Sequence, residues 1–312
     1  MKIIFELPFY SPLVGGINLT IQLAKAIGAE IHFQNLARGY PYGIGVKHTV
    51  GYNNHPECDL WVTYSDNAHS EILLNNRKIK RVAVFMQSYG MSISNERKNA
   101  LNPRILCLCT TKKIEQAIKS DGGNPINIGF GLEMQEFYDY GYERKNYLAI
   151  MYHDMASKKY DTAVKVADSL FEKGVIEGVI SFGGNDNYKK HKHPKGLVAH
   201  YGNATRSGVA EVFNQCKAYL MPSISEGLNL TPIESTLCGC PAVICDGAIG
   251  EILIDGTNCF VVGKEDYFAM EESITDILIN FVAYSNLVRH KMDFVITNYT
   301  WENTVKKFMD AL

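Results

Sequence analysis

The sequence lacks the features of several large classes of protein. No apolar run approaches the roughly 18 residues that a membrane-spanning helix needs. Basic residues do not outnumber acidic ones, with 31 Lys and Arg against 33 Asp and Glu, so the basic stripe of a nucleic-acid-binding domain is missing. Glu6 and Pro8 interrupt the stretch that would form the apolar core of a signal peptide. We therefore expect a cytoplasmic protein with no nucleic-acid partner.

Metal and disulfide patterns are also missing. The eight cysteines lie in apolar segments, and their two close pairs have C-x-C spacing, which is tighter than zinc sites use. We expect buried thiols, since free cysteine behaves as a small hydrophobic residue. His191 and His193 lie in the polar segment 188–196, which holds no acidic residue or cysteine, and this favours a solvated basic loop over a metal site. No metal or other cofactor is expected.

What is present predicts an α/β protein with two domains. A chain of 312 residues exceeds the size at which a single core usually keeps growing. Short apolar runs alternate with helical patterns in both halves, which is typical of parallel sheets covered by helices. Strands are expected at 2–7, 30–33, 59–64, 81–86, 104–109, 147–152, 178–183, 217–222 and 242–245. Helices are expected at 17–28, 68–76, 111–120, 158–173, 231–238 and beyond 265.

The first site signal is a pair of glycines after the first predicted strand. Open α/β sheets bind ligands beyond the carboxyl ends of their strands. Gly15 and Gly16 allow close backbone approach there, and the N-terminus of the following helix favours an anion. A plain tight turn explains the pair equally well. The pattern is not G-x-G-x-x-G, so a nicotinamide site gains no support.

The second signal is a pair of glutamates in the segment 221–262. Glu226 follows a strand in a loop, and Glu234 lies eight residues later on the helix that this loop opens, with Pro232 expected at the first helical position. Carboxylates accept hydrogen bonds from sugar and ribose hydroxyls. Thr231 and Glu234 also match a capping box, in which Glu234 only bonds back to the helix start.

This segment resembles a known family. The pattern P-S-x-x-E-G-x-x-L-x-x-x-E-x-x-x-x-G-x-P begins at Pro222, and D-G-x-N ends at Asn258. Together they are similar to the donor-site block of glycosyltransferase family 4. GGINLTIQLAKAIG, GFGLEMQEF and TWENTVKKF resemble the family's first loop and helix, its interdomain segment and its C-terminal helix.

The resemblance implies the GT-B fold, with two Rossmann-like domains whose parallel sheets face a central cleft. The acceptor-side domain would span residues 1–140, with a helix over 295–312 crossing back to it, and the domain for the nucleotide sugar would span 141–294. In the family the first glutamate contacts the donor sugar and the second contacts the ribose, which assigns these roles to Glu226 and Glu234. The loop residues Gly227, Leu228, Asn229 and Leu230 would join Gly15 and Gly16 in binding the donor.

The family also holds the diphosphate with an Arg and a Lys that follow the first strand of the second domain. This chain has no Arg there. If Lys158 matches the lysine, His153 stands in the Arg position, whereas a match at Lys159 would put Asp154 there. We favour His153 and Lys158, because a carboxylate beside a diphosphate is unfavourable. Lys159 remains the alternative, and both lysines could be plain surface residues.

The first domain departs further from the family. Many members carry a His after the strand that corresponds to 81–86, and here Gln87 and Ser88 stand there. Gln87 and Tyr89 are the candidates for the acceptor side. The Q-S-Y sequence and the H-x4-K spacing resemble a subgroup that builds rhamnose-containing polysaccharides.

The resemblance thus implies a metal-independent, retaining glycosyltransferase, with Glu226, Lys158 and His153 as catalytic residues. Its partners would be a nucleotide sugar and a glycan or lipid-linked saccharide. A lipid-linked acceptor would bring the protein to the inner face of a membrane, although no strongly basic amphipathic helix supports this. Two alternatives remain: a sugar-nucleotide epimerase of the same fold, and a non-catalytic sugar-nucleotide-binding partner of another transferase.

Overall fold

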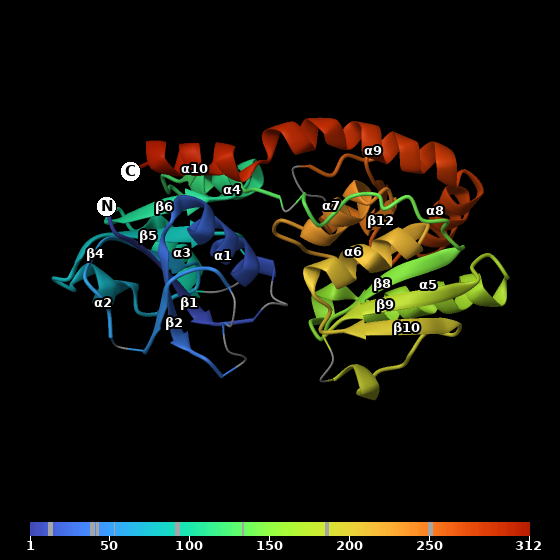
Figure 1. Ribbon diagram of the computed structural model, residues 1–312, viewed down its shortest axis with the longest axis horizontal. Coiled ribbons are helices and arrows are strands. Elements are labelled where there is room, and N and C mark those ends of the chain that lie inside the picture. The colour runs from blue at the N-terminus through green and yellow to red at the C-terminus, as the bar shows by residue number, and fades with distance from the viewer. Residues whose placement is uncertain are drawn as a thin grey trace. The chain divides into compact units, whose positions relative to one another are not determined.

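The chain forms two compact units. The computed structural model describes residues 1–11, 15–37, 41, 44–52, 54–90, 94–132, 134–184, 187–248 and 252–312. Unit 1 is Met1–Leu132 with Asn298–Leu312, and unit 2 is Glu133–Thr297 (Figure 1). The sequence placed these boundaries after residues 140 and 294. No helix in the described part of the chain is long and apolar enough to span a bilayer.

Unit 1 is built on a parallel sheet with the strand order β3-β2-β1-β4-β5-β6-β7. Its strands are β1 (Ile3–Phe9), β2 (Glu30–Asn35), β3 (His48–Val50), β4 (Cys58–Tyr64), β5 (Ile79–Met86), β6 (Ile105–Cys109) and β7 (Ile126–Asn127). Its helices are α1 (Gly15–Ile27), α2 (Ser70–Leu74), α3 (Ser94–Leu101), α4 (Lys112–Ser120) and α10 (Trp301–Asp310). The central strands β1, β4 and β5 are buried over most of their length, because helices cover both faces of such a sheet.

The last helix, α10, packs into the core of unit 1. The Phe308 ring is fully buried and lies 6.0 Å from the ring of Phe5 on β1. The segment that follows β7 passes close to the start of α10, where a Cβ on Gly131 would lie 2.3 Å from the Trp301 ring. The chain therefore needs glycine at position 131 to let α10 approach.

Unit 2 repeats the design with the strand order β10-β9-β8-β11-β12-β13, again all parallel. Its strands are β8 (Tyr147–Tyr152), β9 (Gly178–Gly183), β10 (Leu197–Gly202), β11 (Ala218–Met221), β12 (Ala242–Cys245) and β13 (Phe260–Val262). Its helices are α5 (Tyr160–Glu172), α6 (Arg206–Gln215), α7 (Leu230–Leu237), α8 (Tyr267–Ile279) and α9 (Phe281–Asn298), with 3₁₀ turns at Ala156–Lys158, Tyr188–Lys190 and Asp246–Ala248.

The predicted α/β class with two parallel sheets is confirmed. Strands over 147–152, 178–183 and 242–245 match the expected ranges residue for residue. The elements β10 and α6 were not predicted. β10 is an edge strand with no fully buried residue, so its sequence carries no continuous apolar run. The expected buried thiols are also confirmed, since all eight cysteines are buried and free.

Candidate functional site

The loops that follow β8 and β11 emerge side by side in unit 2. The two strands are parallel neighbours, and the chain order runs outward from them in opposite directions along the sheet. Ligands of open α/β sheets bind at such a switch point, beyond the carboxyl ends of the strands. His153 and Lys158 come from the first loop, and Glu226 comes from the second.

Lys158 and Glu226 form an ion pair between these loops. The Lys158 Nζ lies 2.6 Å from Glu226 Oε1 and 2.8 Å from Oε2, so the ammonium group faces both carboxylate oxygens. The Ile224 amide donates to the Ser157 carbonyl oxygen at 2.9 Å, which ties the two loops together. The side chains are 17% and 10% exposed, so solvent screens the pair less than it screens a surface pair.

Lys159 takes a different direction from its neighbour. It lies in the left-handed region, with a φ of 50°, at the start of α5. Its Nζ is 2.7 Å from Glu265 Oε1, and this hydrogen bond and the charge of Glu265 raise the pKa of Lys159. Of the two neighbouring lysines, Lys158 is therefore the one that contacts Glu226.

His153 is exposed at the end of β8. Its Nδ1 accepts a hydrogen bond from the Met155 amide at 3.1 Å, which leaves Nε2 as the protonated nitrogen of the neutral ring. Loss of hydration and the positive charge of Lys158 hold the pKa of His153 below its usual 6.5. Neighbouring Asp154 is anchored elsewhere, by the Tyr152 hydroxyl and the Asn187 amide.

Helix α7 begins earlier than the sequence predicted. Leu230 is its first residue and Asn229, with a φ of 52°, is its N-cap, so Pro232 is the third helical residue and not the first. The loop residues Gly227 and Leu228 are half-buried beside this helix start. The expected Pro232 position was wrong, because the left-handed turn at Asn229 starts the helix before the proline is reached.

Glu234 is the buried acidic residue of α7, only 2% exposed. Its Oε1 accepts a hydrogen bond from Arg206 Nη2 at 2.6 Å, while Oε2 has no hydrogen-bond partner among the described residues. The capping-box alternative is wrong, since Thr231 is not the N-cap. The Thr231 hydroxyl instead contacts the Tyr219 hydroxyl at 3.0 Å and the Met221 sulfur at 3.2 Å.

Sequence reasoning missed Arg206. It is the first residue of α6, which Thr205 caps by accepting a hydrogen bond from the Gly208 amide at 3.1 Å. It stands 28 positions before Glu234, and no spacing rule joins a helix start to a residue of the next helix. The single signal in the sequence was the Thr cap itself, which predicts the helix but not the ion pair.

In unit 1, the glycines and Gln87 lie together at the carboxyl ends of β1 and β5. Gly15 and Gly16 are the first residues of α1 and are exposed; residues 12–14 of the same predicted loop lie outside the described residues. Gln87 Nε2 donates to the Gly16 carbonyl oxygen at 2.9 Å and to Thr20 Oγ1 at 2.8 Å. A Cβ on Gly16 would lie 2.8 Å from Gln87 Oε1, so any other residue at position 16 would displace the end of the Gln87 side chain.

Tyr89 is fixed by contacts within unit 1. Its hydroxyl donates to Asp121 Oδ2 at 2.7 Å, and burial together with this carboxylate raises the pKa of Tyr89 to about 12. The buried Glu96 holds the residues on either side, accepting from the Ser88 hydroxyl at 3.0 Å and the Gly90 amide at 3.1 Å. Hydrogen bonds to Glu96 and Asp121 therefore hold the segment 88–90 that follows β5.

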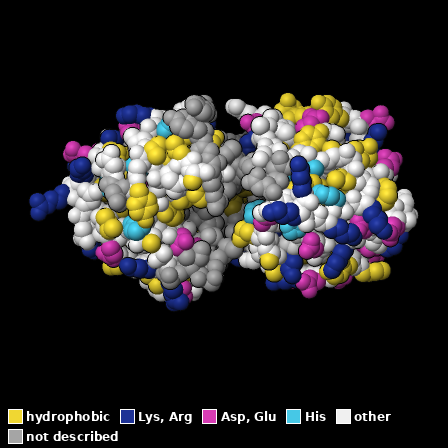
Figure 2. Space-filling model, turned by 90° about the horizontal axis from the view of Figure 1, so that it is seen from below, with side chains coloured by type: hydrophobic (Ala, Val, Ile, Leu, Met, Phe, Trp, Pro, Cys, Tyr) yellow, Lys and Arg dark blue, Asp and Glu magenta, His cyan; other side chains and the backbone are white. Residues whose placement is uncertain are grey.

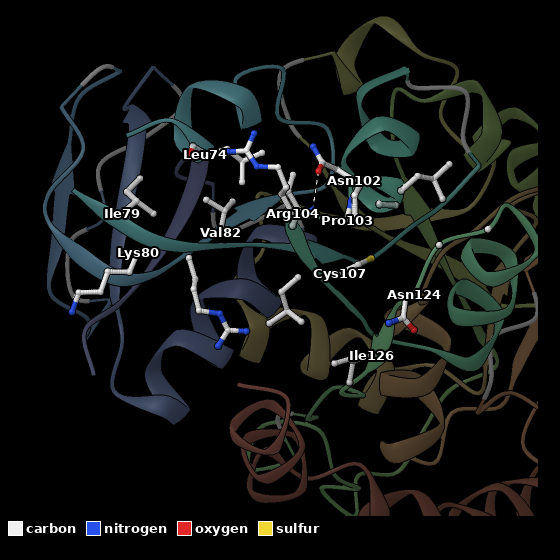
Figure 3. Close-up of a pocket in the computed structure, with 17 residues that line it drawn as sticks. Leu74, Ile79, Lys80, Val82, Asn102, Pro103, Arg104, Cys107, Asn124 and Ile126 are labelled. Carbon is white, nitrogen blue, oxygen red and sulfur yellow. Dashed lines mark hydrogen bonds between the residues drawn. The ribbon is translucent and has the colours of Figure 1, made fainter. Parts of the chain in front are cut away.

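A cavity of about 560 Å³ in unit 1 has none of Gly15, Gly16, Gln87 and Tyr89 in its lining. It is lined from the amino ends of β5, β6 and β7 and the turns that lead into them, and Lys80, Arg104 and Asn124 are among its polar lining residues (Figure 3). Ligands of parallel sheets bind at the opposite ends of the strands. We therefore do not assign the cavity to the candidate site.

No group of three or more His, Cys, Asp or Glu side chains in the described residues is arranged to hold a metal ion. His191 and His193 are exposed and pack against the rings of Tyr152 and Tyr188 at 5.2 and 4.5 Å. They belong to a segment rich in exposed lysine, and Figure 2 shows Lys, Arg and His side chains gathered on one face of unit 2. This matches the expected solvated basic loop.

The amino-acid sequence of unit 2 is similar to that of a known protein family. Residues 149–280 match the family model described as "Glycosyl transferases group 1". An uncharacterized glycosyltransferase of Methanocaldococcus jannaschii is 28% identical over 105 residues, 33% of this chain and 30% of that protein. The alpha-galactosylglucosyldiacylglycerol synthase of Streptococcus pneumoniae is 24% identical over 160 residues, 49% of this chain and 41% of that protein. The matches thus span less than half of either relative.

A solved structure extends the likeness to the whole chain. Anabaena HepE, in complex with UDP-glucose, superimposes with a TM-score of 0.82 over 100% of both chains at 14% sequence identity. Such low identity shows the fold alone. The chain therefore has the GT-B fold, and its residues 149–280 are similar to the group 1 glycosyl transferases.

Proposed function

We propose that this protein is a metal-independent, retaining glycosyltransferase that moves a sugar from a nucleoside-diphosphate sugar to a hydroxyl of a glycan or lipid-linked saccharide. The observation that carries the proposal is the Lys158–Glu226 pair at the switch point of unit 2. It lies within the family match and joins an ammonium group with a carboxylate whose spacing to Glu234 is that of the family's two donor-binding glutamates.

Lys158, Glu226 and Glu234 each have a role in donor binding. Lys158 leaves Glu226 to contact the diphosphate, and Glu226 then accepts hydrogen bonds from hydroxyls of the donor sugar. Glu234 accepts a hydrogen bond from a ribose hydroxyl with Oε2. That oxygen is covered in this structure, so neighbouring side chains must shift when the nucleotide binds.

Further donors reach the diphosphate from backbone and ring nitrogens. His153 offers its Nε2–H as a neutral donor in the position where the family has an Arg. The amides of Gly227, Leu228 and Leu230 lie at the start of α7, where helix ends favour anions. In unit 1, Gly15 and Gly16 at the start of α1 are the proposed donor-binding residues. Gln87 and Tyr89 are the proposed acceptor-side residues of unit 1.

The reaction breaks the bond between the anomeric carbon and the phosphate oxygen and forms one between that carbon and the acceptor oxygen. The acceptor proton passes to the departing diphosphate. Lys158 stabilises the negative charge that develops on this leaving group, and removal of one such preorganised donor typically lowers the rate by about 10²–10³-fold.

The relatives suggest which substrates to test first. The HepE structure contains UDP-glucose, and the Streptococcus relative is named for a galactosylglucosyl diacylglycerol. UDP-sugars and a saccharide linked to a lipid are therefore the first donors and acceptors to test, with a nucleotide-linked rhamnose added because of the resemblance in the segment 84–90.

The decisive experiment measures binding and products together. A thermal-shift panel of nucleotide sugars identifies the donor, because a ligand that binds the folded state raises its stability. The reaction with that donor and an acceptor should release the nucleoside diphosphate and an elongated glycan. An isomerised donor would identify an epimerase, and binding without any product from the acceptors tested would favour a non-catalytic partner.

Lysine variants test the site. Lys158→Ala should lose most of the transfer rate and keep the fold. Lys173→Ala, which removes an exposed ion pair with Glu271 in the same unit, is the matched control and should retain the rate. Loss in Lys159→Ala with full activity in Lys158→Ala would move the diphosphate contact to Lys159.

A further inference from the structure

We propose that Arg206 is a positioning residue of the donor site, which holds Glu234 in the orientation that recognises a ribose hydroxyl. This inference rests on the proposed function and adds to it a residue that lies outside the motif of paired glutamates. Its basis is the contrast between the two oxygens of Glu234, one bound to Arg206 and the other without a partner among the described residues.

Two side-chain contacts and the position of its backbone restrict the guanidinium group of Arg206. Arg206 Cζ lies 4.5 Å from the centre of the buried Phe137 ring, a distance at which a cation is attracted to the ring face. Its Nη2 donates to Glu234 Oε1 at 2.6 Å. The backbone of Arg206 is the first turn of α6, capped by Thr205. A side chain held by a ring, a carboxylate and a capped helix has little freedom to turn.

The pair also orients the carboxylate. A buried ionised carboxylate can accept about four hydrogen bonds, and buried polar atoms without a partner are uncommon in native proteins. Arg206 holds Oε1 and thereby determines where Oε2 lies. Without Arg206, Glu234 would be a buried charge with no ion-pair partner among the described residues, and its carboxylate would be free to rotate away from the ribose position.

The experiment measures the affinities of UDP, 2′-deoxy-UDP and 3′-deoxy-UDP for the full chain by calorimetry. The wild type should bind UDP more tightly than at least one deoxy analogue, by about tenfold to a hundredfold, the usual effect of one hydrogen bond to a charged group. Arg206→Gln should bind UDP as weakly as that analogue and should no longer distinguish the two. Arg206→Lys keeps the charge but not the planar geometry, and should recover part of the discrimination.

A purely structural role would give a different pattern. Arg206→Gln would then lower the unfolding temperature while the ratio of UDP to deoxy-UDP affinity stayed at the wild-type value, and this would overturn the inference. Arg289→Gln is the matched control, because it removes another arginine–carboxylate pair of unit 2, the one with Asp139. It should leave the ratio unchanged.

A double-variant cycle separates this inference from the proposed function. If Arg206 acts through Glu234, the variant with both Arg206→Gln and Glu234→Gln should bind UDP no more weakly than Glu234→Gln alone. Additive losses would overturn the inference. Loss of ribose discrimination in Glu234→Gln with full discrimination in Arg206→Gln would also overturn it and leave the proposed function standing. Full discrimination in Glu234→Gln would contradict the ribose role of Glu234 itself.

Discussion

Two buried glutamates, one in each unit, differ in how their oxygens are used. Glu6 on β1 and Glu234 on α7 are each 2% exposed. Glu6 accepts hydrogen bonds from four side chains, those of Gln34 at 3.0 Å, Trp61 at 3.1 Å, Thr63 at 2.8 Å and Asn67 at 2.7 Å. Glu234 accepts one, from Arg206, and its second oxygen has no partner among the described residues.

The difference separates a structural carboxylate from a candidate ligand-binding one. The four donors of Glu6 come from β2, β4 and the turn after β4, so its charge is dispersed over neutral groups that hold neighbouring strands in register. Glu234 has a single charged partner and unused capacity to accept. Burial alone therefore does not tell the two apart, and the completeness of their hydrogen bonds does.

The largest expected effect is on the stability of unit 1. Glu6→Ala should lower the free energy of unfolding by at least about 3 kcal/mol, because several buried donors lose their acceptor at once. Urea denaturation measures this change. Glu30→Ala on the neighbouring strand removes a surface ion pair with Lys47 and should have little effect. Equal effects of the two variants would show that the Glu6 network is not structural.

The next effect is on nucleotide affinity. Glu234→Gln should weaken binding of the nucleotide by about tenfold to a hundredfold, since the charge that accepts from the ribose is lost. The amide oxygen of glutamine can still accept from Arg206, so the free energy of unfolding should change by less than about 1 kcal/mol. Calorimetric titration and urea denaturation of the same variant provide the two numbers. A large loss of stability with unchanged affinity would make Glu234 a second structural carboxylate.

His32 and His153 differ in the same way as the two glutamates, in how many of their polar atoms have hydrogen-bond partners. The buried His32 of β2 uses both ring nitrogens, with Thr49 Oγ1 and the Gly51 carbonyl oxygen each at 2.7 Å. Loss of hydration lowers the pKa of His32 below its usual 6.5. Its contribution to stability is therefore present above about pH 6.5 and is lost as the pH falls toward the lower pKa of the folded state. Between neutral pH and about pH 5, the free energy of unfolding should fall less in His32→Asn than in the wild type. An equal fall in both proteins would contradict the lowered pKa of His32.

The smallest expected effect is on the pH dependence of donor affinity and concerns His153. This exposed residue accepts a hydrogen bond from the Met155 amide with one ring nitrogen. Its pKa is lowered in the free protein, and a bound diphosphate would raise it by attracting the proton. Affinity for a UDP-sugar should therefore increase as the pH falls from about 8 to about 5. His153→Asn should flatten this dependence. A wild-type affinity that is constant over the same range would remove His153 from the diphosphate site.

The sequence predicted the central strands of both sheets, the two glutamates of unit 2 and a lysine beside them, because periodicity and motif spacing are local properties. The edge strands β3, β7, β10 and β13 were not predicted. It favoured Lys158 over Lys159 on electrostatic grounds, but it could not predict the left-handed backbone at position 159, which separates the directions of the two side chains. The Arg206–Glu234 pair was equally inaccessible, because it depends on how α6 and α7 pack. The predicted start of α7 was wrong because it assumed that Pro232 is the first helical residue. The left-handed N-cap at Asn229 starts the helix two residues earlier.

The most direct test of the account is a crystal structure of the protein with a bound UDP-sugar. We expect Lys158 Nζ within about 3 Å of a phosphate oxygen, no longer paired with both oxygens of Glu226, and a ribose hydroxyl within the same distance of Glu234 Oε2. A nucleotide bound away from the loops after β8 and β11, with the Lys158–Glu226 pair intact, would contradict it.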